Sequence, residues 1–231
     1  MKKQDNLIEK ITKQTINSYL VKEAMMDGFS YEKLNSIRSF AERIRYCKQY
    51  LGKPIGSGSG RMVFQLDDEK CLKLAKNKKG IAQNEAEDEN YQGMGWNQDL
   101  VPQCFEHAEN YSWMITEYVL LAKKSDFKYL YNISWEEYCN FVWSCYYEFA
   151  RRTTFRHGGL DKERFLEILE NNEGNFLHTL HDYITNWQIE QIGDFTRLAN
   201  LGLAMRNGDP QIVILDNGLN EEVFNTYYKR F

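Results

Sequence analysis

The sequence lacks paired cysteines, long apolar runs and an excess of positive charge. Its 5 cysteines are odd in number and scattered, with no zinc-site spacing, so we expect reduced thiols in a core. No apolar run approaches the ~20 residues that span a bilayer, and residues 1–5 begin no secretory signal. The net charge of −4 is atypical of a nucleic-acid binder. The sequence therefore predicts a cytoplasmic protein without membrane or nucleic-acid partners.

The first 50 residues form a predicted helical extension. Residues 6–26 carry apolar side chains among charges, as in an amphipathic helix, and Asp27-Gly28 ends that pattern. Ser30 can cap a second helix that reaches about Tyr50, with Leu34 and Cys47 on its apolar face.

Residues 51–119 change to a strand pattern, which predicts an antiparallel sheet with one inserted helix. Residues 61–66 and 70–76 alternate around a turn and form a predicted hairpin. Residues 81–92 are polar, rich in glutamate and typical of a helix, and residues 101–107 and 113–118 are two further strands. The fold class that follows is α+β.

Residues 120–231 are mostly helical. Ser134 begins a capping box for a helix to about Phe149, Asp161 begins another, and a third follows Gly174. Residues 201–206 and 211–215 form a late hairpin around the turn at 207–210.

A glycine-rich segment, Gly56-Ser57-Gly58-Ser59-Gly60, lies between two strand patterns. Glycines let a backbone approach phosphate oxygens and direct N–H groups at them. No Gly-Lys-Ser/Thr follows, so this is not a Walker A loop. The alternative is an ordinary hairpin turn.

Lys73 lies in the middle of a strand, between apolar Leu72 and Leu74 that point to the opposite face. It could reach phosphates beneath the glycine-rich segment, oriented by a carboxylate of the acidic helix. Glu87 is the first candidate for that carboxylate and Glu85 the second. The alternatives are an edge lysine and a solvated acidic face.

Asp216 follows the apolar run 212–215 and precedes Asn217-Gly218. A carboxylate at the end of a strand could hold Mg²⁺. Alone, the Asp-Asn-Gly run is also a common turn.

In this order along the chain, these features resemble the protein-kinase-like superfamily over residues 51–219. Val63 matches the valine of the family's glycine-rich loop, Cys71-Leu72-Lys73 its lysine strand, and Asp216-Asn217-Gly218 its Asp-Phe-Gly. The segment 113–119 resembles the family's hinge, which implies that the backbone at Glu117 and Val119 meets adenine. The chain also resembles small uncharacterised kinase-like proteins of bacteriophages.

Several positions depart from that pattern. Arg61 stands at the third glycine position, and no His-Arg-Asp is present. The nearest substitute is Asp194 with Asn200, 6 residues apart where the family has five, and only 13 residues follow Gly218. We therefore expect a two-lobed kinase-like fold with a truncated C-lobe and altered catalytic parts.

The resemblance implies binding of ATP and Mg²⁺, with atypical phosphotransferase activity as a possible extension. Lys73 would hold phosphates, Glu87 would orient Lys73, Asp216 and Asn200 would hold the metal, and Asp194 would be a base. Lys73 and Asp216 would then face one cavity. The alternatives are nucleotidyl transfer, or a pseudokinase that binds a protein partner as a phage structural or host-modulating module, in the host cytoplasm or the virion.

Overall fold

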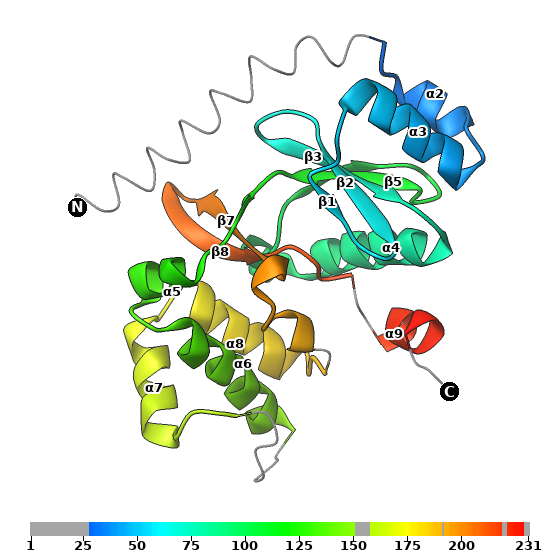
Figure 1. Ribbon diagram of the computed structural model, residues 1–231. Helices are drawn as coiled ribbons and strands as arrows, with labels where there is room; N and C mark the ends of the chain where they lie inside the picture. Colours follow the sequence, from blue (N-terminus) through cyan, green and yellow to red (C-terminus); the bar gives the residue numbers. More distant parts are fainter. Residues whose placement is uncertain (1–27, 151–157, 191, 219–220, 229–231) are drawn as a thin grey trace. The chain divides into compact units, whose positions relative to one another are not determined.

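The computed structural model describes residues 28–150, 158–190, 192–218 and 221–228 (Figure 1). The chain divides into two compact units. Of the described residues, unit 1 holds 28–91, 103–119 and 222–228, and unit 2 holds the rest, within 92–102 and 120–221. The helix predicted over residues 6–26 lies outside the described residues.

Unit 1 contains a five-stranded antiparallel sheet in the order β1-β2-β3-β5-β4. Its strands are β1 (Gly56–Ser57), β2 (Arg61–Gln65), β3 (Lys70–Ala75), β4 (Cys104–His107) and β5 (Trp113–Glu117). The helices of this unit are α2 (Tyr31–Ser36), α3 (Phe40–Leu51), α4 (Lys78–Gly93) and α9 (Glu221–Tyr227). α4 continues two residues into the segment assigned to unit 2, and α9 begins one residue before the segment assigned to unit 1. Helices combined with antiparallel strands confirm the predicted α+β class.

The β2–β3 hairpin forms as the alternating pattern predicts. Val63 pairs with Lys73 across it, and the Asp67 carboxylate closes the turn by accepting from the N–H groups of Glu69 and Lys70 at 2.8 and 2.7 Å. An aspartate that accepts from its own turn stabilises that turn locally. The hairpin therefore sets the register of the strand that carries Lys73.

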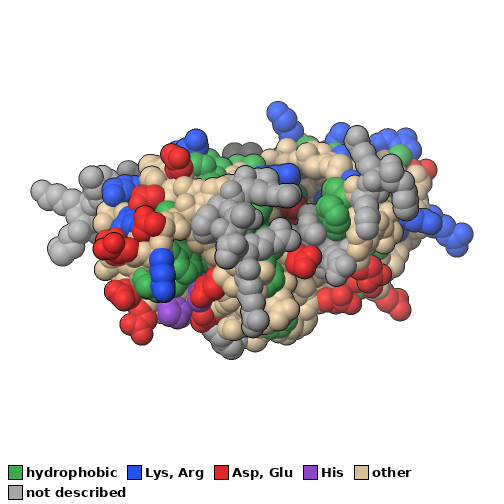
Figure 2. All heavy atoms as spheres, turned by 90° about the horizontal axis from the view of Figure 1, so that it is seen from below, with side chains coloured by type: hydrophobic (Ala, Val, Ile, Leu, Met, Phe, Trp, Pro, Cys, Tyr) green, Lys and Arg blue, Asp and Glu red, His purple; other side chains and the backbone are tan. Residues whose placement is uncertain are grey.

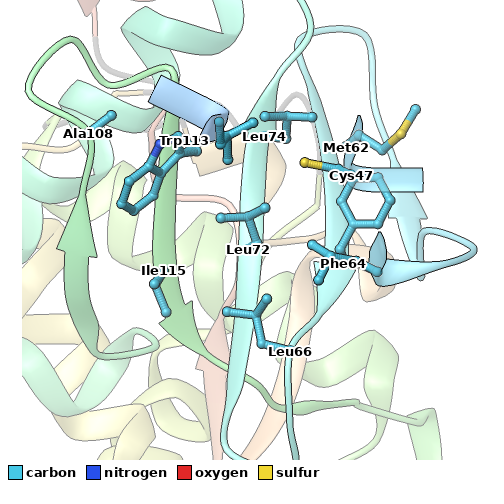
Figure 3. Packing of buried hydrophobic residues seen from close by; sticks show 11 residues of the cluster. Cys47, Met62, Phe64, Leu66, Leu72, Leu74, Ala108, Trp113 and Ile115 are labelled. Atoms are coloured by element: carbon cyan, nitrogen blue, oxygen red, sulfur yellow. The ribbon is translucent and has the colours of Figure 1, made fainter. Parts of the chain in front are cut away.

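One face of this sheet forms the core of unit 1 (Figure 3). Leu72, fully buried on β3, lies between Phe64 of β2 and Ile115 of β5. The helical extension covers that face, and it contributes Leu34 from α2 and Cys47 from α3. Successive strand residues point to opposite faces, so the same strand leaves Lys73 on the other face.

From residue 28 onward, where the structure describes it, the extension comprises two helices, and the prediction of one continuous helix from Ser30 to about Tyr50 was wrong. Ser30 does cap α2 by accepting from the Lys33 N–H, but Ile37 and Ser39 are extended and the chain re-enters a helix at Phe40. Ser and other short polar residues favour such helix starts. The break lets Leu34 and Cys47 both reach the core.

Unit 2 is mostly helical and carries a small three-stranded sheet, ordered β6-β7-β8. The strands are β6 (Leu120–Leu121), β7 (Leu201–Arg206) and β8 (Asp209–Ile214). The helices are α5 (Lys124–Tyr131), α6 (Trp135–Phe149), α7 (Lys162–Asn171) and α8 (Phe176–Asn186), with 3-10 turns η1 (Gly95–Leu100), η2 (Ile192–Asp194) and η3 (Leu198–Asn200).

The helix starts of unit 2 follow the predicted capping residues. Ser134 accepts from the Glu137 N–H while the Glu137 carboxylate accepts from the Ser134 N–H, the two bonds of a capping box. Asp161 caps α7 through a single side-chain bond, by accepting from the Arg164 N–H at 2.9 Å. Both predicted starts are confirmed.

The late hairpin is confirmed, with a tighter turn than expected. Only Asn207 and Gly208 lie outside the β7–β8 pairing, and their φ angles of 52° and 90° are both positive. Asn-Gly suits a two-residue turn because both residues tolerate the left-handed region. Asp209 and Pro210, expected in the turn, belong to β8.

None of the described helices combines the length and apolarity needed to cross a bilayer. The face shown in Figure 2 carries both acidic and basic side chains, in keeping with the net charge of −4. All five cysteines are free thiols, and three of them, Cys47, Cys71 and Cys145, are buried as expected, whereas Cys104 and Cys139 are half-buried.

Candidate functional site

The glycine-rich loop joins β1 to β2 in unit 1. Gly56 pairs with Val63, and the Gly58 N–H donates to the Arg61 carbonyl at 2.9 Å, which closes the loop into a hairpin. Ser57, Gly58 and Ser59 are exposed at its tip. A short turn with glycines leaves its backbone accessible to a ligand.

Side chains from the segment before α4 and from its first turn contact this loop. Lys76 Nζ donates to the Gly58 carbonyl at 2.7 Å and to Ser57 Oγ at 3.3 Å. Lys79 Nζ donates to Ser59 Oγ at 2.7 Å. Three positive or polar groups, counting Asn77, which donates to the Ser59 carbonyl at 3.1 Å, thus surround the loop tip.

The base of the loop touches the backbone of α4. The Lys76 N–H donates to the Gly60 carbonyl at 2.7 Å, and a Cβ on Gly80 would overlap that same carbonyl oxygen. Only glycine at position 80 permits so close an approach of two backbones. Gly80 therefore lets the loop and the helix start pack together.

Lys73 and Glu87 form a buried ion pair between β3 and α4. Lys73 Nζ donates to Glu87 Oε1, and both residues are buried. The structure thus pairs Lys73 with the first of the two carboxylates expected for it, while Glu85 is exposed. Glu87 and Lys73 are 14 residues apart in sequence, so the contact depends on the tertiary packing of α4 beneath the sheet.

Arg61 is a third member of this cluster that the sequence did not predict. Its Nη1 donates to Glu87 Oε2 and, at 3.3 Å, to Asn84 Oδ1. Both oxygens of Glu87 therefore accept from a cation. The available signal was strand parity: Arg61 and Val63 lie on one face of β2, and Val63 pairs with Lys73.

The two cations set the ionisation of Glu87. Burial alone would raise the pKa of this carboxyl, but the Arg61 guanidinium and then the Lys73 ammonium outweigh burial and hold the pKa below its ordinary value. Glu87 is therefore charged at neutral pH. A fixed anion at this point orients both cations.

The hinge-like segment, residues 113–119, consists of β5 and the two residues that follow it. The backbone of this segment is hydrogen-bonded to neighbouring segments. The Glu117 N–H donates to the Gln103 carbonyl at 2.8 Å, and the Tyr118 N–H donates to the Glu69 carbonyl at 2.6 Å. The preceding Thr116 is fully buried, and its hydroxyl lies 3.3 Å from Cys71 Sγ. Val119 is the last residue of unit 1 before unit 2 resumes at Leu120.

In unit 2 the structure brings Asp194, Asn200 and Asp216 together. Asn200 Nδ2 donates to the Asp194 carbonyl at 3.3 Å, and the Asn200 carbonyl accepts from the N–H of Leu215, next to Asp216, at 2.8 Å. The hairpin β7–β8 returns the chain over the intervening residues. This hairpin brings the residues after β8 back beside Asn200.

Charges around Asp194 oppose one another. Burial raises the pKa of Asp194 and the neighbouring Asp216 charge raises it further, while Arg197 and a hydrogen bond from Asn200 lower it, and the net result is a raised pKa. Arg197 Nη1 lies 2.8 Å from Asp194 Oδ1. Arg197 is the member of this set to which the sequence gave no role.

The donor set of unit 2 suits a hard cation. Mg²⁺ prefers oxygen ligands and is commonly held by one or two carboxylates together with substrate phosphates. Asp194, Asp216 and the amide of Asn200 offer such atoms. Among the residues that the structure describes, no group of three or more His, Cys, Asp or Glu side chains could hold a metal ion by itself. A metal here would need ligands from a bound phosphate.

Lys73 belongs to unit 1 and Asp216 to unit 2. The cavity predicted to hold both therefore stays a prediction. Within unit 1 Lys73 contacts Glu87, and within unit 2 Asn200 contacts Asp194 and the residue before Asp216; the roles assigned to these residues stay predictions.

Comparisons with known proteins give little beyond this geometry. No protein-family model matches the sequence, and no curated protein does. Among solved structures, the chain is similar to one described as the structure of the streptomycin-ATP-APH(2″)-IIa ternary complex. The TM-score is 0.35 and the identity 14%, over 79% of this chain and 71% of the other. A likeness of that size carries no argument about function.

Proposed function

We propose that this chain binds a nucleoside triphosphate, ATP by preference, together with Mg²⁺, as a member of the protein-kinase-like superfamily. The observation that carries the proposal is the buried pair of Lys73 and Glu87 on the strand and helix that follow the glycine-rich loop. A buried lysine is costly unless it is paired. A glycine-rich turn whose backbone N–H groups can face an anion, followed by a strand that carries a paired lysine, suits the binding of phosphates.

The groups of unit 1 bind the phosphates. The loop at 56–60 supplies backbone N–H groups, Lys73 supplies a positive charge, and Glu87 orients Lys73. The backbone at Glu117 and Val119 meets the base. Phosphoryl transfer depends mainly on such positioning and on charge stabilisation.

The groups of unit 2 serve the metal and the proton. Asp216 and Asn200 would hold Mg²⁺, which neutralises phosphate charge when it is bound. The raised pKa of Asp194 suits a general base, because a base works best when its pKa approaches the working pH. An atypical phosphotransferase activity follows if an acceptor hydroxyl reaches Asp194.

A second candidate function is a non-catalytic, kinase-like module that binds a protein partner. The observation that favours it is Arg61, which occupies one oxygen of Glu87 and stands where the family has glycine. The Arg61 side chain thus places a second cation on Glu87, directly after the loop, where a glycine would place none. A pseudokinase of this kind, in a phage or its host, would keep the fold and lose phosphoryl transfer.

A thermal-shift titration with ATP and MgCl₂ tests nucleotide binding. Ligand at about 100 times its Kd stabilises the native state by about 2.7 kcal/mol, which raises the melting temperature by several degrees. Lys73→Ala should lose that shift. Lys70→Ala is the matched control on the same strand, because Lys70 lies over the Phe105 ring at 5.1 Å and should keep the shift.

The same titration on the variant Asp216→Asn tests whether Asp216 holds Mg²⁺. This variant should lose the part of the shift that depends on MgCl₂ while it keeps the smaller shift with ATP alone. Incubation with ATP labelled at the γ- or the α-phosphate then separates phosphoryl transfer from nucleotidyl transfer. A parent protein that shows no shift with ATP and MgCl₂ would refute nucleotide binding and favour the non-catalytic module.

A further inference from the structure

Lys79 of α4 connects the glycine-rich loop to the segment that contains α9. Its Nζ donates to Ser59 Oγ at the loop tip at 2.7 Å, and the same Nζ lies 4.4 Å from the centre of the Tyr228 ring. All three residues belong to unit 1. A cation over an aromatic face is attracted by the ring, so Tyr228 restricts where Lys79 can lie.

Gln83 makes a second, independent connection one turn further along α4. It is buried, and its Nε2 donates to the Tyr228 hydroxyl at 3.0 Å. Its Oε1 lies against Gly60, where an added Cβ would overlap it. Gln83 therefore packs against the base of the loop through Oε1, while Nε2 at the other side of the same amide is hydrogen-bonded to Tyr228.

The segment around α9 is itself anchored. Val223 is 4% exposed, and the Tyr228 N–H donates to the Phe224 carbonyl at 2.9 Å. The rings of Phe224 and Tyr228 are parallel with centres 6.4 Å apart. Tyr228 is thus fixed in place by the helix that precedes it.

We propose that Tyr228 is a positioning residue for the glycine-rich loop, which it holds closed through Lys79 at the tip and Gln83 at the base. This role belongs to a segment that kinase-like motifs leave without a function. It rests on the proposed function only where nucleotide affinity is concerned, because the closed state of the loop is a property of unit 1 alone.

The physical effect is a shift between closed and open loop states. Removing the ring and the hydroxyl deletes one cation–π contact and one partly buried hydrogen bond, which together favour closure by roughly tenfold. A loop that is already closed avoids an ordering cost when a phosphate binds. Loss of Tyr228 should therefore open the loop and weaken nucleotide binding.

Hydrogen–deuterium exchange on the full chain, without nucleotide, tests closure directly. In Tyr228→Ala the amides of Gly58 and Lys76, which donate to the Arg61 and Gly60 carbonyls, should exchange roughly tenfold faster. Tyr228→Phe keeps the ring over Lys79 and loses the hydroxyl at Gln83, so its effect should be smaller, at roughly threefold. Tyr227→Ala, a substitution at an exposed neighbour, should leave these rates unchanged.

Two outcomes decide the proposal. Equal loop exchange in the Tyr228→Ala and Tyr227→Ala proteins would overturn it, whatever the nucleotide does. Faster exchange throughout unit 1 in Tyr228→Ala would indicate general loosening, and Tyr228→Phe then decides: a selective change at the loop supports the proposal and no change overturns it.

Nucleotide affinity is the second measurement. The Kd for ATP with MgCl₂ should rise several-fold in Tyr228→Ala. Absence of ATP binding by the parent would refute the proposed function alone.

Discussion

Replacing Glu87 by glutamine should destabilise unit 1 strongly, because it removes the one charge that Lys73 and Arg61 share. Glu87 is 2% exposed, and each of its oxygens accepts from one of these cations. Breaking a buried ion pair by removing one partner typically costs about 3–5 kcal/mol. Glutamine keeps one acceptor oxygen, so we expect a loss near the lower end, about 3 kcal/mol.

Glu85→Gln is the matched control for this prediction. Glu85 lies on the same helix, two residues away, and is exposed. Removing an exposed charge usually changes stability by less than about 0.5 kcal/mol. The two substitutions make the same chemical change, so their difference reports the burial and pairing of Glu87.

The effect should also depend on pH with a defined sign. The Glu87 pKa is lower in the folded chain than in the unfolded one, so its contribution is fully present above the ordinary glutamate value of ~4.3 and is lost as pH falls through the lowered value. The difference in unfolding free energy between the parent and Glu87→Gln should therefore be constant near neutrality and narrow in acid below about pH 4.

Urea denaturation of the full chain, followed by circular dichroism, measures the loss, and hydrogen exchange of the β3 amides assigns it to unit 1. A loss of stability in Glu87→Gln no greater than that in Glu85→Gln at pH 7 would refute a stabilising role for the buried Glu87 charge. A difference in unfolding free energy between the parent and Glu87→Gln that stays constant in acid would also refute it, because the ionisation of Glu87 would then contribute no stability.

Three further predictions concern the loop, a thiol and a helix start. Gly80→Ala should cost about 1–3 kcal/mol in a thermal melt, because its Cβ would overlap the Gly60 carbonyl, whereas Gly58→Ala, with nothing within 4 Å, should be tolerated. Burial raises the pKa of Cys104 to about 12, so a thiol reagent at pH 8 should label it slowly in the folded chain and quickly in urea; equal rates would contradict this. Ser134→Ala should cost about 1 kcal/mol by urea denaturation through loss of the capping box, and an unchanged midpoint would argue against that cap.

Local signals in the sequence predicted most elements of the fold. The β2–β3 hairpin, the capping box at Ser134 and the Asn207-Gly208 turn depend on neighbours within a few residues, and all three occur. The break between α2 and α3 was missed because the apolar periodicity continues across it, although Ser39 offers a local helix-start signal.

The candidate site was predictable in residue type and not in pairing. The buried face of α4 is largely polar, including Gln83, Asn84 and Glu87, so hydrophobic periodicity could not tell Glu87 from the exposed Glu85. In the sequence, Arg61 was noted only as a departure from the family's glycine-rich loop, where the third glycine would stand. Its contact with Glu87 spans 26 residues and depends on how α4 packs beneath β2 and β3.

The amino-acid sequence by itself determined the local elements, the order of the motifs and the face of β3 on which Lys73 lies, because these follow from backbone geometry and short-range hydrogen bonds. Tertiary structure alone decided which cations share Glu87, how Asp194 and Asn200 meet the residues after β8, and that Tyr228 reaches the supports of the glycine-rich loop. The reason is physical: a charge or a hydrogen bond acts over a few ångströms in space, and distance along the chain does not set that separation.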